Sequence, residues 1–353
     1  MYPALAVLEA FRAEHPASEI LWIGGEGGME ETLVKRMSIP FQSIPAAGVH
    51  GVGLRALPGN IARLVRGYLA ARRILHEFRP DALFFTGGYL AAPMALAGRR
   101  IPILLYVPDI EPGLAIRTIA RFADCIAITA PASINYYPSR ARLVKTGYPV
   151  RADLLKWDRR SARKALHLHE DKPVLLVTGG SRGARSINQA VLEHLPFLLE
   201  LAQVIHVSGQ LDWPNVEAAT GSLSKPSRSD YHAFPYLHEE MGAALAASDL
   251  VISRAGASVL GEYPLLGLPA VLVPYPHAWR YQKVNADYLA NHGAAIVLED
   301  DRLKKDLPQM VQLLLKDPSK QESMRDAMRT LANPQAARQI SRQLFELAGE
   351  VRP

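Results

Sequence analysis

Short apolar runs rich in β-branched residues alternate with helical patterns along almost the whole chain. Continuous apolar runs of this kind are typical of strands covered on both faces, as in parallel sheets. The alternation therefore predicts a doubly wound α/β architecture. The expected strands lie in the segments EILWIGG, PFQSIPA, ALFFTGG, PILLYVPD, CIAITA, ARLVKTGYPV, PVLLVTGG, QVIHVSG, YHAFPYL, DLVISRAG, PAVLVPYP and AAIVLED.

The alternation is interrupted once, by a polar, arginine-rich stretch at residues 151–172 that is interpreted as an interdomain linker running into a helix. In both halves of the chain an expected strand ends in Thr-Gly-Gly, within LFFTGGYLAAP and LLVTGGSRGAR. We therefore expect two Rossmann-like domains that face each other across a cleft. Their expected bounds are residues 1–152 and 153–332, followed by a terminal helix at 333–353.

The composition is that of an ordinary globular protein, with 49% hydrophobic and 21% charged residues. The single cysteine excludes a framework of disulfides within the chain, and its apolar surroundings predict a buried thiol in a reducing compartment. Neither a membrane span of roughly 20 apolar residues nor a signal peptide is recognised, so we expect a cytoplasmic protein. The net charge of +6 favours anionic partners such as phosphates, acidic lipid surfaces or nucleic acid.

The chain begins with a helical pattern, MYPALAVLEAFRAEHP, in which Pro3 suits the first turn of a helix. In an α/β chain, a helix ahead of the first strand is usually the second half of a βα unit. We therefore expect an apolar strand and a glycine-rich loop upstream of Met1. That strand would be central in a doubly wound sheet, and without it the strands that flank it would lack a neighbour.

The sharpest local signal is VLLVTGGSRGARSINQA, where a buried strand runs into a glycine-rich loop and then a helix. Gly180, Ser181 and Arg182 would offer backbone N–H groups and a cation to an anion at the helix start. The loop is neither a P-loop nor a dinucleotide fingerprint, because no Gly-Lys-Ser/Thr follows and the next strand lacks a terminal acidic residue. Phosphate binding is favoured over a tight turn that merely requires small residues.

A second signal is SRAGASVLGEYPLLGLPAVLVPYPHAWRYQKVNA, in which Ser258 and Glu262 fall four apart on an expected helix. Glu262 would accept hydrogen bonds from ribose hydroxyls, or else be a solvated carboxylate on a helix surface. Gln282 and Asn285 could bind sugar hydroxyls, or else be exposed amides. His277 has no second ligand at metal spacing, so no metal site is predicted.

Two acidic residues in the first half, Asp109 and Glu111, follow an expected strand at its carboxyl end, within YVPDIEPG. Ligands of α/β proteins bind at such ends. Either carboxylate could be a general base or hold a cation. A solvated turn rich in proline and aspartate is an equally good interpretation.

Residues 55–79 contain many arginines and one acidic residue, together with an apolar stripe. Most of that stripe is expected to be the core face of a helix. The arginines, with the apolar residues near them, are nonetheless a candidate patch for an anionic membrane surface. Nucleic acid is disfavoured, because stacking aromatics and a recognised motif are lacking. The candidate patch residues are Arg63, Arg66, Arg72 and Arg73.

Taken together in order and spacing, several segments resemble the MurG family, the undecaprenyl-diphospho-muramoylpentapeptide N-acetylglucosaminyltransferases of peptidoglycan synthesis. The segments are YPALAV, GVHGVGLRAL, GGYLAAP, TGYPVR, GGSRGARSIN, SRAGASVLGE, GLPAVLVPYP and QKVNADYLANHGAA. The resemblance implies a GT-B fold whose last helix crosses back to the first domain. It implies inverting transfer of N-acetylglucosamine from its UDP donor to lipid I, a polyprenyl-diphosphate-linked acceptor, at the inner membrane face, without a cofactor.

The resemblance also implies which residues bind substrate, with Glu262 on the ribose and Gln282 on the sugar. Together with the glycine loop, the implied set is Asp109, Arg151, Gly180, Ser181, Arg182, Leu237, Ala257, Ser258, Val259, Leu260, Gly261, Glu262 and Gln282. The family's membrane-binding patch lies in the first domain, which is consistent with the arginine-rich stretch.

The chain departs from the family pattern in two places. Where many members read His-Glu-Gln-Asn, it has Tyr106, Val107, Pro108 and Asp109, so Asp109 replaces an asparagine that contacts the sugar. The family's Gly-Gly-Thr-Gly-Gly-His loop, with its candidate catalytic histidine, would lie directly before Met1. Asp109 is therefore the candidate catalytic residue. The alternatives are a GT-B transferase for another lipid, such as diacylglycerol, and a nucleotide-sugar-binding homologue without catalysis.

Overall fold

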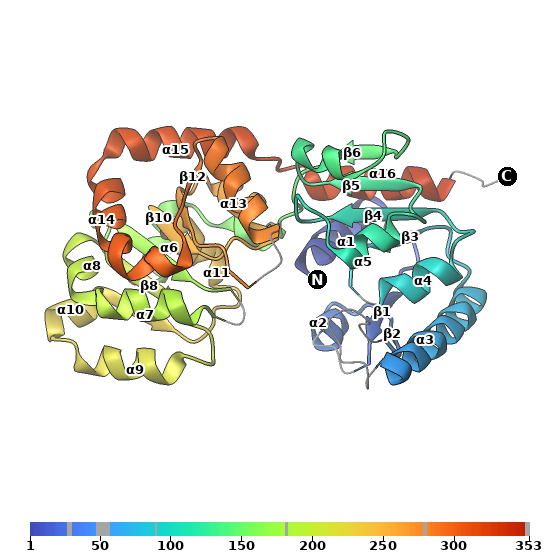
Figure 1. The fold of residues 1–353 in the computed structure, drawn as a ribbon, viewed down its shortest axis with the longest axis horizontal. Helices are drawn as coiled ribbons and strands as arrows, with labels where there is room; N and C mark the ends of the chain where they lie inside the picture. The colour runs from blue at the N-terminus through green and yellow to red at the C-terminus, as the bar shows by residue number, and fades with distance from the viewer. Residues whose placement is uncertain (27–29, 47–56, 89, 181–182, 278–280, 350–353) are drawn as a thin grey trace. The chain divides into compact units, whose positions relative to one another are not determined.

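The computed structural model describes residues 1–26, 30–46, 57–88, 90–180, 183–277 and 281–349 (Figure 1). The chain divides into two compact units, each of which is described by itself. Unit 1 comprises Met1–Pro108, Pro112–Pro149 and Gln335–Pro353, and unit 2 comprises Asp109–Glu111 and Val150–Pro334. Each segment that the sequence predicts to be a strand contains one, so the α/β prediction is confirmed.

Unit 2 contains one six-stranded parallel sheet with the strand order β12-β11-β10-β7-β8-β9. From β7 the chain proceeds outward to β9 and then returns to β10 on the other side of β7. Ligands of open α/β sheets bind at the carboxyl ends of the strands where the order reverses in this way. The strands are β7 (Val174–Thr178), β8 (Gln203–Val207), β9 (Tyr231–Phe234), β10 (Leu250–Ser253), β11 (Ala270–Leu272) and β12 (Ala295–Val297).

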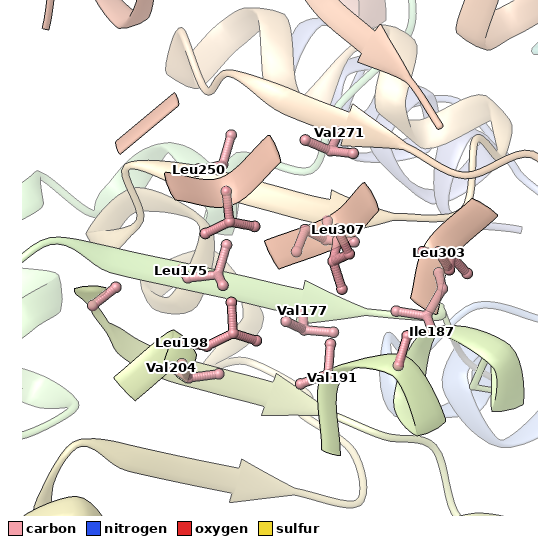
Figure 2. Packing of buried hydrophobic residues seen from close by; sticks show 14 of the residues in the cluster. Leu175, Val177, Ile187, Val191, Leu198, Val204, Leu250, Val271, Leu303 and Leu307 are labelled. Atoms are coloured by element: carbon pink, nitrogen blue, oxygen red, sulfur yellow. The ribbon is translucent and has the colours of Figure 1, made fainter. Parts of the chain in front are cut away.

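The core of unit 2 lies between this sheet and the helices that pack on it. Figure 2 shows Leu175 and Val177 of β7 beside Ile187 and Val191 of α7 and Leu307 of α14, all of them buried. The helices are α6 (Arg159–Ala165), α7 (Arg185–Glu193), α8 (Leu195–Leu201), α9 (Trp213–Ser222), α10 (Lys225–Ser229), α11 (Met241–Ala247), α12 (Glu262–Leu266), α13 (Tyr281–Asn291), α14 (Leu303–Lys316) and α15 (Pro318–Leu331), with 3-10 turns η2 (Ala152–Lys156), η3 (Ala257–Leu260) and η4 (Asp300–Arg302).

The stretch interpreted as a linker is packed into unit 2, where it forms η2 and α6. The Asp158 side chain caps α6 by accepting hydrogen bonds from the backbone N–H groups of Arg160 and Ser161, at 2.9 and 3.0 Å. Leu154 and Arg163 are buried. The polar composition thus reflects a capped amphipathic helix and its ion pairs rather than a free connection.

Unit 1 contains two separate parallel sheets, β1-β2 and β3-β4-β5-β6. Within the described residues β1 pairs with β2 alone and β3 with β4 alone. The sequence predicts a further strand between β1 and β3. Within the described residues, these two strands are therefore end strands of separate sheets. Both sheets contribute to one apolar cluster, which joins Ile23 of β1 and Phe85 of β3 to Ala71 of α3. The strands are β1 (Trp22–Gly25), β2 (Phe41–Ile44), β3 (Leu83–Phe85), β4 (Ile103–Val107), β5 (Cys125–Ile128) and β6 (Leu143–Lys145).

The C-terminal helix α16 belongs to unit 1, where it packs against the first helix of the chain. The rings of His15 and Phe345 stack with their centroids 3.8 Å apart, and the Ser341 hydroxyl donates to the Glu14 carboxylate at 3.3 Å. The helices of unit 1 are α1 (Tyr2–Glu14), α2 (Glu30–Arg36), α3 (Leu57–Phe78), α4 (Ala91–Ala97), α5 (Leu114–Ile119) and α16 (Ala336–Gly349), with one 3-10 turn, η1 (Pro131–Tyr136).

Candidate active site at the carboxyl edge of the unit 2 sheet

The glycine-rich loop after β7 is a tight turn in which glycine is required for more than one reason. A Cβ on Gly179 would lie 2.1 Å from the Ala184 nitrogen, and one on Gly183 would lie 2.2 Å from the Ser208 carbonyl oxygen. Gly180 has a φ of +78°, and no atom of the described residues lies within 4 Å of the place its Cβ would take. Packing therefore requires glycine at positions 179 and 183. At Gly180 the described residues leave room for a ligand to approach the backbone. Ser181 and Arg182 lie outside the described residues.

The segment after β10 is not the continuous helix that the sequence predicts. The 3-10 turn η3 ends at Leu260, Gly261 interrupts the helical geometry with φ −131° and ψ −50°, and α12 then begins at Glu262. The spacing of four nevertheless brings Ser258 within hydrogen-bonding reach of the Glu262 carboxylate. Val259 and Leu260 are buried, so that their side chains pack rather than face a ligand.

Glu262 is a half-buried carboxyl with a perturbed pKa. Burial raises its pKa to about 7, although the charge of Arg151 and the hydrogen bond from Ser258 act in the opposite direction. Arg151 also lies 3.5 Å from the Asp153 carboxylate, whose negative charge raises the Glu262 pKa further. The structure thus brings together Glu262, Ser258 and Arg151, three of the predicted residues, from distant parts of unit 2.

The two amides predicted to bind sugar have different environments. Gln282, near the start of α13, is half-buried, and its side-chain oxygen accepts the Tyr275 N–H at 2.9 Å. Asn285 is fully buried and is a structural residue, so its predicted role as a sugar ligand is wrong. Leu237, which follows β9, is also buried and has only its backbone to offer to a ligand.

Asn285 binds the short segment Asp109–Glu111 to unit 2. Its amide nitrogen donates to the Asp109 carboxylate at 2.8 Å and to the Ala255 carbonyl at 3.2 Å, while its oxygen accepts the Ile110 N–H at 3.1 Å. Burial raises the pKa of Asp109, against the effect of this hydrogen bond. Glu111 is also buried, so the interpretation of this segment as a solvated turn is wrong.

The arginine-rich helix α3 of unit 1 presents a mixed basic and apolar surface. Its core side carries Ala71 and Ile74, which are buried, and Gly67, where a Cβ would lie 2.2 Å from the Pro45 carbonyl oxygen. The predicted patch arginines, Arg63, Arg66, Arg72 and Arg73, are all exposed.

Three apolar residues of α3 are exposed at intervals of four: Ile61, Val65 and Leu69, at 50%, 54% and 57%. The expectation that most of the apolar stripe faces the core is therefore wrong for these three. They share one face of the helix, since residues four apart lie one above the other.

Two features are absent within the residues that the structure describes. No group of three His, Cys, Asp or Glu side chains is arranged to hold a metal ion. No described helix is both long and apolar enough to cross a membrane.

Sequence reasoning missed two residues that shape the site. Asp153 lies two positions after Arg151 and modifies the charge around Glu262. Tyr275 holds the Gln282 oxygen and lies under the guanidinium of Arg254. The aromatic residue in PYPH was the available signal for Tyr275, whereas Asp153 carried none because acidic residues are common in connections.

The two parallel-sheet α/β units, with a charged site at the carboxyl edge of the second, define a protein of the GT-B class of glycosyltransferases. Comparison with known families agrees: the glycosyltransferase family 28 N-terminal domain matches residues 1–128 and the family 28 C-terminal domain matches residues 174–340. The chain belongs to glycosyltransferase family 28.

Individual relatives also cover almost the whole chain. The UDP-N-acetylglucosamine–N-acetylmuramyl-(pentapeptide) pyrophosphoryl-undecaprenol N-acetylglucosamine transferase of Roseiflexus sp. (strain RS-1) is 39% identical over 400 residues, covering 97% of this chain and 91% of the relative. That of Desulforudis audaxviator is 38% identical over 362 residues, with coverage of 99% and 96%. The crystal structure of MurG from Acinetobacter baumannii is 28% identical, with a TM-score of 0.74 and coverage of 98% and 95%. The resemblance to the MurG family is thereby confirmed.

Proposed function

We propose that this protein transfers N-acetylglucosamine from UDP-N-acetylglucosamine to lipid I, giving lipid II. The names of the full-length relatives give this reaction, and the site residues suit the donor. The observation that carries the proposal is the Glu262 carboxyl, held by Ser258 beside Arg151 at the carboxyl edge of the sheet. A carboxylate there can accept hydrogen bonds from both ribose hydroxyls of a nucleotide.

The proposed chemistry is an in-line displacement. The acceptor hydroxyl attacks the anomeric carbon, its proton passes to a base, and UDP leaves from the opposite side. The first turn of α7, which follows the glycine loop, has backbone N–H groups without a partner inside the helix and can offer them to the departing diphosphate. Asp109 is the candidate base within the described residues, because burial raises its pKa and a base of higher pKa takes a proton more readily.

A parallel assay of acceptors tests the proposed reaction. The full chain is incubated with labelled UDP-N-acetylglucosamine and either lipid I or diacylglycerol, and lipid products are separated. Labelled lipid II with lipid I alone is the expected result. Product from diacylglycerol alone would contradict the proposed acceptor. Calorimetric binding of UDP without turnover of either lipid would instead identify a nucleotide-sugar-binding homologue without catalysis.

Replacing Gly256 by alanine is expected to weaken UDP binding at least threefold without loss of thermal stability. Gly256 has an ordinary φ of −66°, and among the described residues its Cβ would meet no atom within 4 Å. The described part of the chain therefore does not require glycine there, and alanine stabilises compatible sites by about 0.4–1 kcal/mol. The reason that we propose for glycine at this position is close approach of a ligand at the start of η3.

The matched control is Gly221→Ala on α9, where a Cβ also meets nothing within 4 Å. Calorimetry with UDP and a thermal melt are measured on both variants. Gly221→Ala should leave UDP affinity unchanged. Unchanged affinity in Gly256→Ala as well would mean that no ligand atom approaches this position.

We further propose that α3 binds the protein peripherally to the cytoplasmic face of the cell membrane. Its exposed residues Ile61, Val65 and Leu69 offer apolar area at the surface of the helix, and the four patch arginines offer positive charge to anionic lipids. A lipid-linked acceptor would then be reached at the membrane surface.

Replacing Arg63, Arg66, Arg72 and Arg73 together by glutamine is expected to weaken binding to anionic vesicles by about 1 kcal/mol for each arginine near the surface. Replacing Ile61, Val65 and Leu69 by serine should weaken binding at high salt as well. Co-sedimentation with phosphatidylglycerol vesicles measures both.

The matched control for the apolar variant is Leu313→Ser on α14, which removes a residue of similar exposure (61%) from unit 2. It should leave vesicle binding unchanged. If both α3 variants sediment like the unaltered chain, this helix does not contact lipid.

A further inference from the structure

The hydrogen bond from the Tyr275 N–H determines which end of the Gln282 carboxamide is the oxygen. The Tyr275 backbone N–H can only donate, so the Gln282 atom 2.9 Å away is the oxygen. The oxygen of Gln282 is thus bound to the chain, so the NH₂ group, with its two donors, is the part of the side chain that can bind a ligand. A sugar hydroxyl can accept such a hydrogen bond.

The backbone that supplies this N–H is held by Arg254. One guanidinium nitrogen, Nη1, donates to the carbonyls of Val273 and Pro274 at 3.2 and 3.4 Å. The guanidinium carbon also lies 5.2 Å from the centre of the Tyr275 ring, the distance of a cation–π contact. Arg254 therefore fixes three consecutive residues after β11.

Arg254 is itself immobilised at the carboxyl edge of the sheet. Its side chain is 11% exposed and forms an ion pair with Asp300 through Nη1. Its Nη2 donates to the Ser186 hydroxyl at 2.7 Å, and that hydroxyl donates to Asp300 at 2.7 Å. Contacts to α7, η4 and the residues after β11 thus converge on one arginine that follows β10.

We propose that Arg254 is a positioning residue for donor-sugar recognition. It holds Val273–Tyr275 so that the Tyr275 N–H fixes the Gln282 oxygen, and Gln282 then presents its N–H donors to a hydroxyl of the donor sugar. This inference rests on the proposed function, because it assumes a UDP-sugar donor. Lysine cannot replace the arginine, since its single ammonium cannot serve Asp300, Ser186 and two carbonyls from a planar fork.

The test compares binding of UDP with binding of UDP-N-acetylglucosamine by calorimetry. Gln282→Glu keeps an acceptor for the Tyr275 N–H but removes the NH₂ donors. The measured quantity is the ratio of the affinity for UDP-N-acetylglucosamine to the affinity for UDP. In Gln282→Glu this ratio should fall at least tenfold compared with the unaltered chain. Arg254→Lys should lower the same ratio at least fivefold, with UDP affinity changed less than threefold.

A double variant distinguishes positioning from general destabilisation. Because Arg254 acts through Gln282, Arg254→Lys should change the ratio less than twofold when added to Gln282→Ala. The matched control is Arg325→Lys, which weakens another arginine–aspartate pair of unit 2 and should lower the melting temperature without changing the ratio.

The possible outcomes separate the two proposals. If the unaltered chain binds neither UDP nor UDP-N-acetylglucosamine, the proposed donor is wrong. If it binds both, and Arg254→Lys leaves the ratio unchanged or has its full effect in the absence of Gln282, the positioning role of Arg254 is wrong.

Discussion

Replacing Asp249 by asparagine is expected to lower the free energy of unfolding of unit 2 by about 3–5 kcal/mol, the cost of leaving buried charges without their partner. Asp249 is 5% exposed and accepts a hydrogen bond from the Val174 N–H at 2.8 Å. Arg163, which is 2% exposed, lies 2.8 Å from the same carboxylate, and Arg325 lies 3.2 Å from it. Asparagine would turn an N–H donor toward these cations and leave the buried Arg163 without its carboxylate partner, whereas Arg325 would keep Glu322 at 3.4 Å.

The loss should appear in stability but not in donor binding. Asp249 precedes β10 and binds the first residue of β7, so it joins the two strands at their amino ends, opposite the candidate site. Calorimetric melting should show the unit 2 transition lowered by roughly 10 °C, since 1 kcal/mol corresponds to about 2–4 °C in a unit of this size. UDP affinity measured well below the melt should stay within twofold.

Two further variants make the result interpretable. Asp326→Asn removes an exposed carboxylate that pairs with Arg329, and should change stability by less than about 0.5 kcal/mol. If Asp249→Asn does not fold, the milder Arg325→Gln should still lower the melt by several degrees. A loss below about 1 kcal/mol in Asp249→Asn would show that the ion pairs do not stabilise the fold.

The strands followed from local patterns, and the donor site that we propose rests on the same patterns. Runs such as VLLV and LVI are continuously apolar because β7 and β10 are buried on both faces. Glycine after such a run marks the carboxyl edge, which is why the loop after β7 and the segment after β10 can be recognised in the sequence alone.

The contacts that sequence analysis did not predict join residues that are far apart in the chain. The Asn285–Asp109 hydrogen bond joins residues 176 positions apart, and Arg163 and Asp249 are 86 apart. His206 stands in an apolar strand and is fully buried, which lowers its pKa to about 4; it is accommodated by Tyr231 and Asn188, at 2.8 and 3.0 Å. No local periodicity encodes such partners.

Replacing Glu262 by glutamine is expected to weaken UDP binding by about 1.5–3 kcal/mol, because it removes charge-assisted hydrogen bonds to ribose. The same change is expected to stabilise the free protein above pH 7. The two effects have one cause, since the carboxylate that would bind the ribose is costly to ionise while no ligand is present.

The sign of the stability effect follows from the pKa. Burial raises the Glu262 pKa to about 7 from an ordinary 4.5. The folded state therefore binds this proton more tightly than the unfolded state, and the stability so gained is complete below about pH 4.5 and lost as the pH rises through 7. Glutamine is neutral throughout, so the variant should exceed the unaltered chain by about 1–3 kcal/mol at pH 8 and match it near pH 4.5.

Binding should show the opposite dependence on pH. Ribose hydroxyls donate to the ionised carboxylate, so the affinity of the unaltered chain for UDP-N-acetylglucosamine should fall as the pH is lowered through 7, while that of Glu262→Gln stays flat. The nucleotide sugar is used here because its diphosphate is esterified at both ends, whereas the terminal phosphate of UDP titrates at about pH 6. The charged neighbours of Glu262 are Arg151 and Asp153. Thermal melts and calorimetry with UDP-N-acetylglucosamine at pH 5.5 to 8.5 measure both effects, with the exposed Glu217→Gln of α9 as the control. If Glu262→Gln loses affinity but gains no stability at pH 8, ionisation of Glu262 does not destabilise the free protein. If Glu262→Gln keeps its affinity, the ribose does not bind at Glu262.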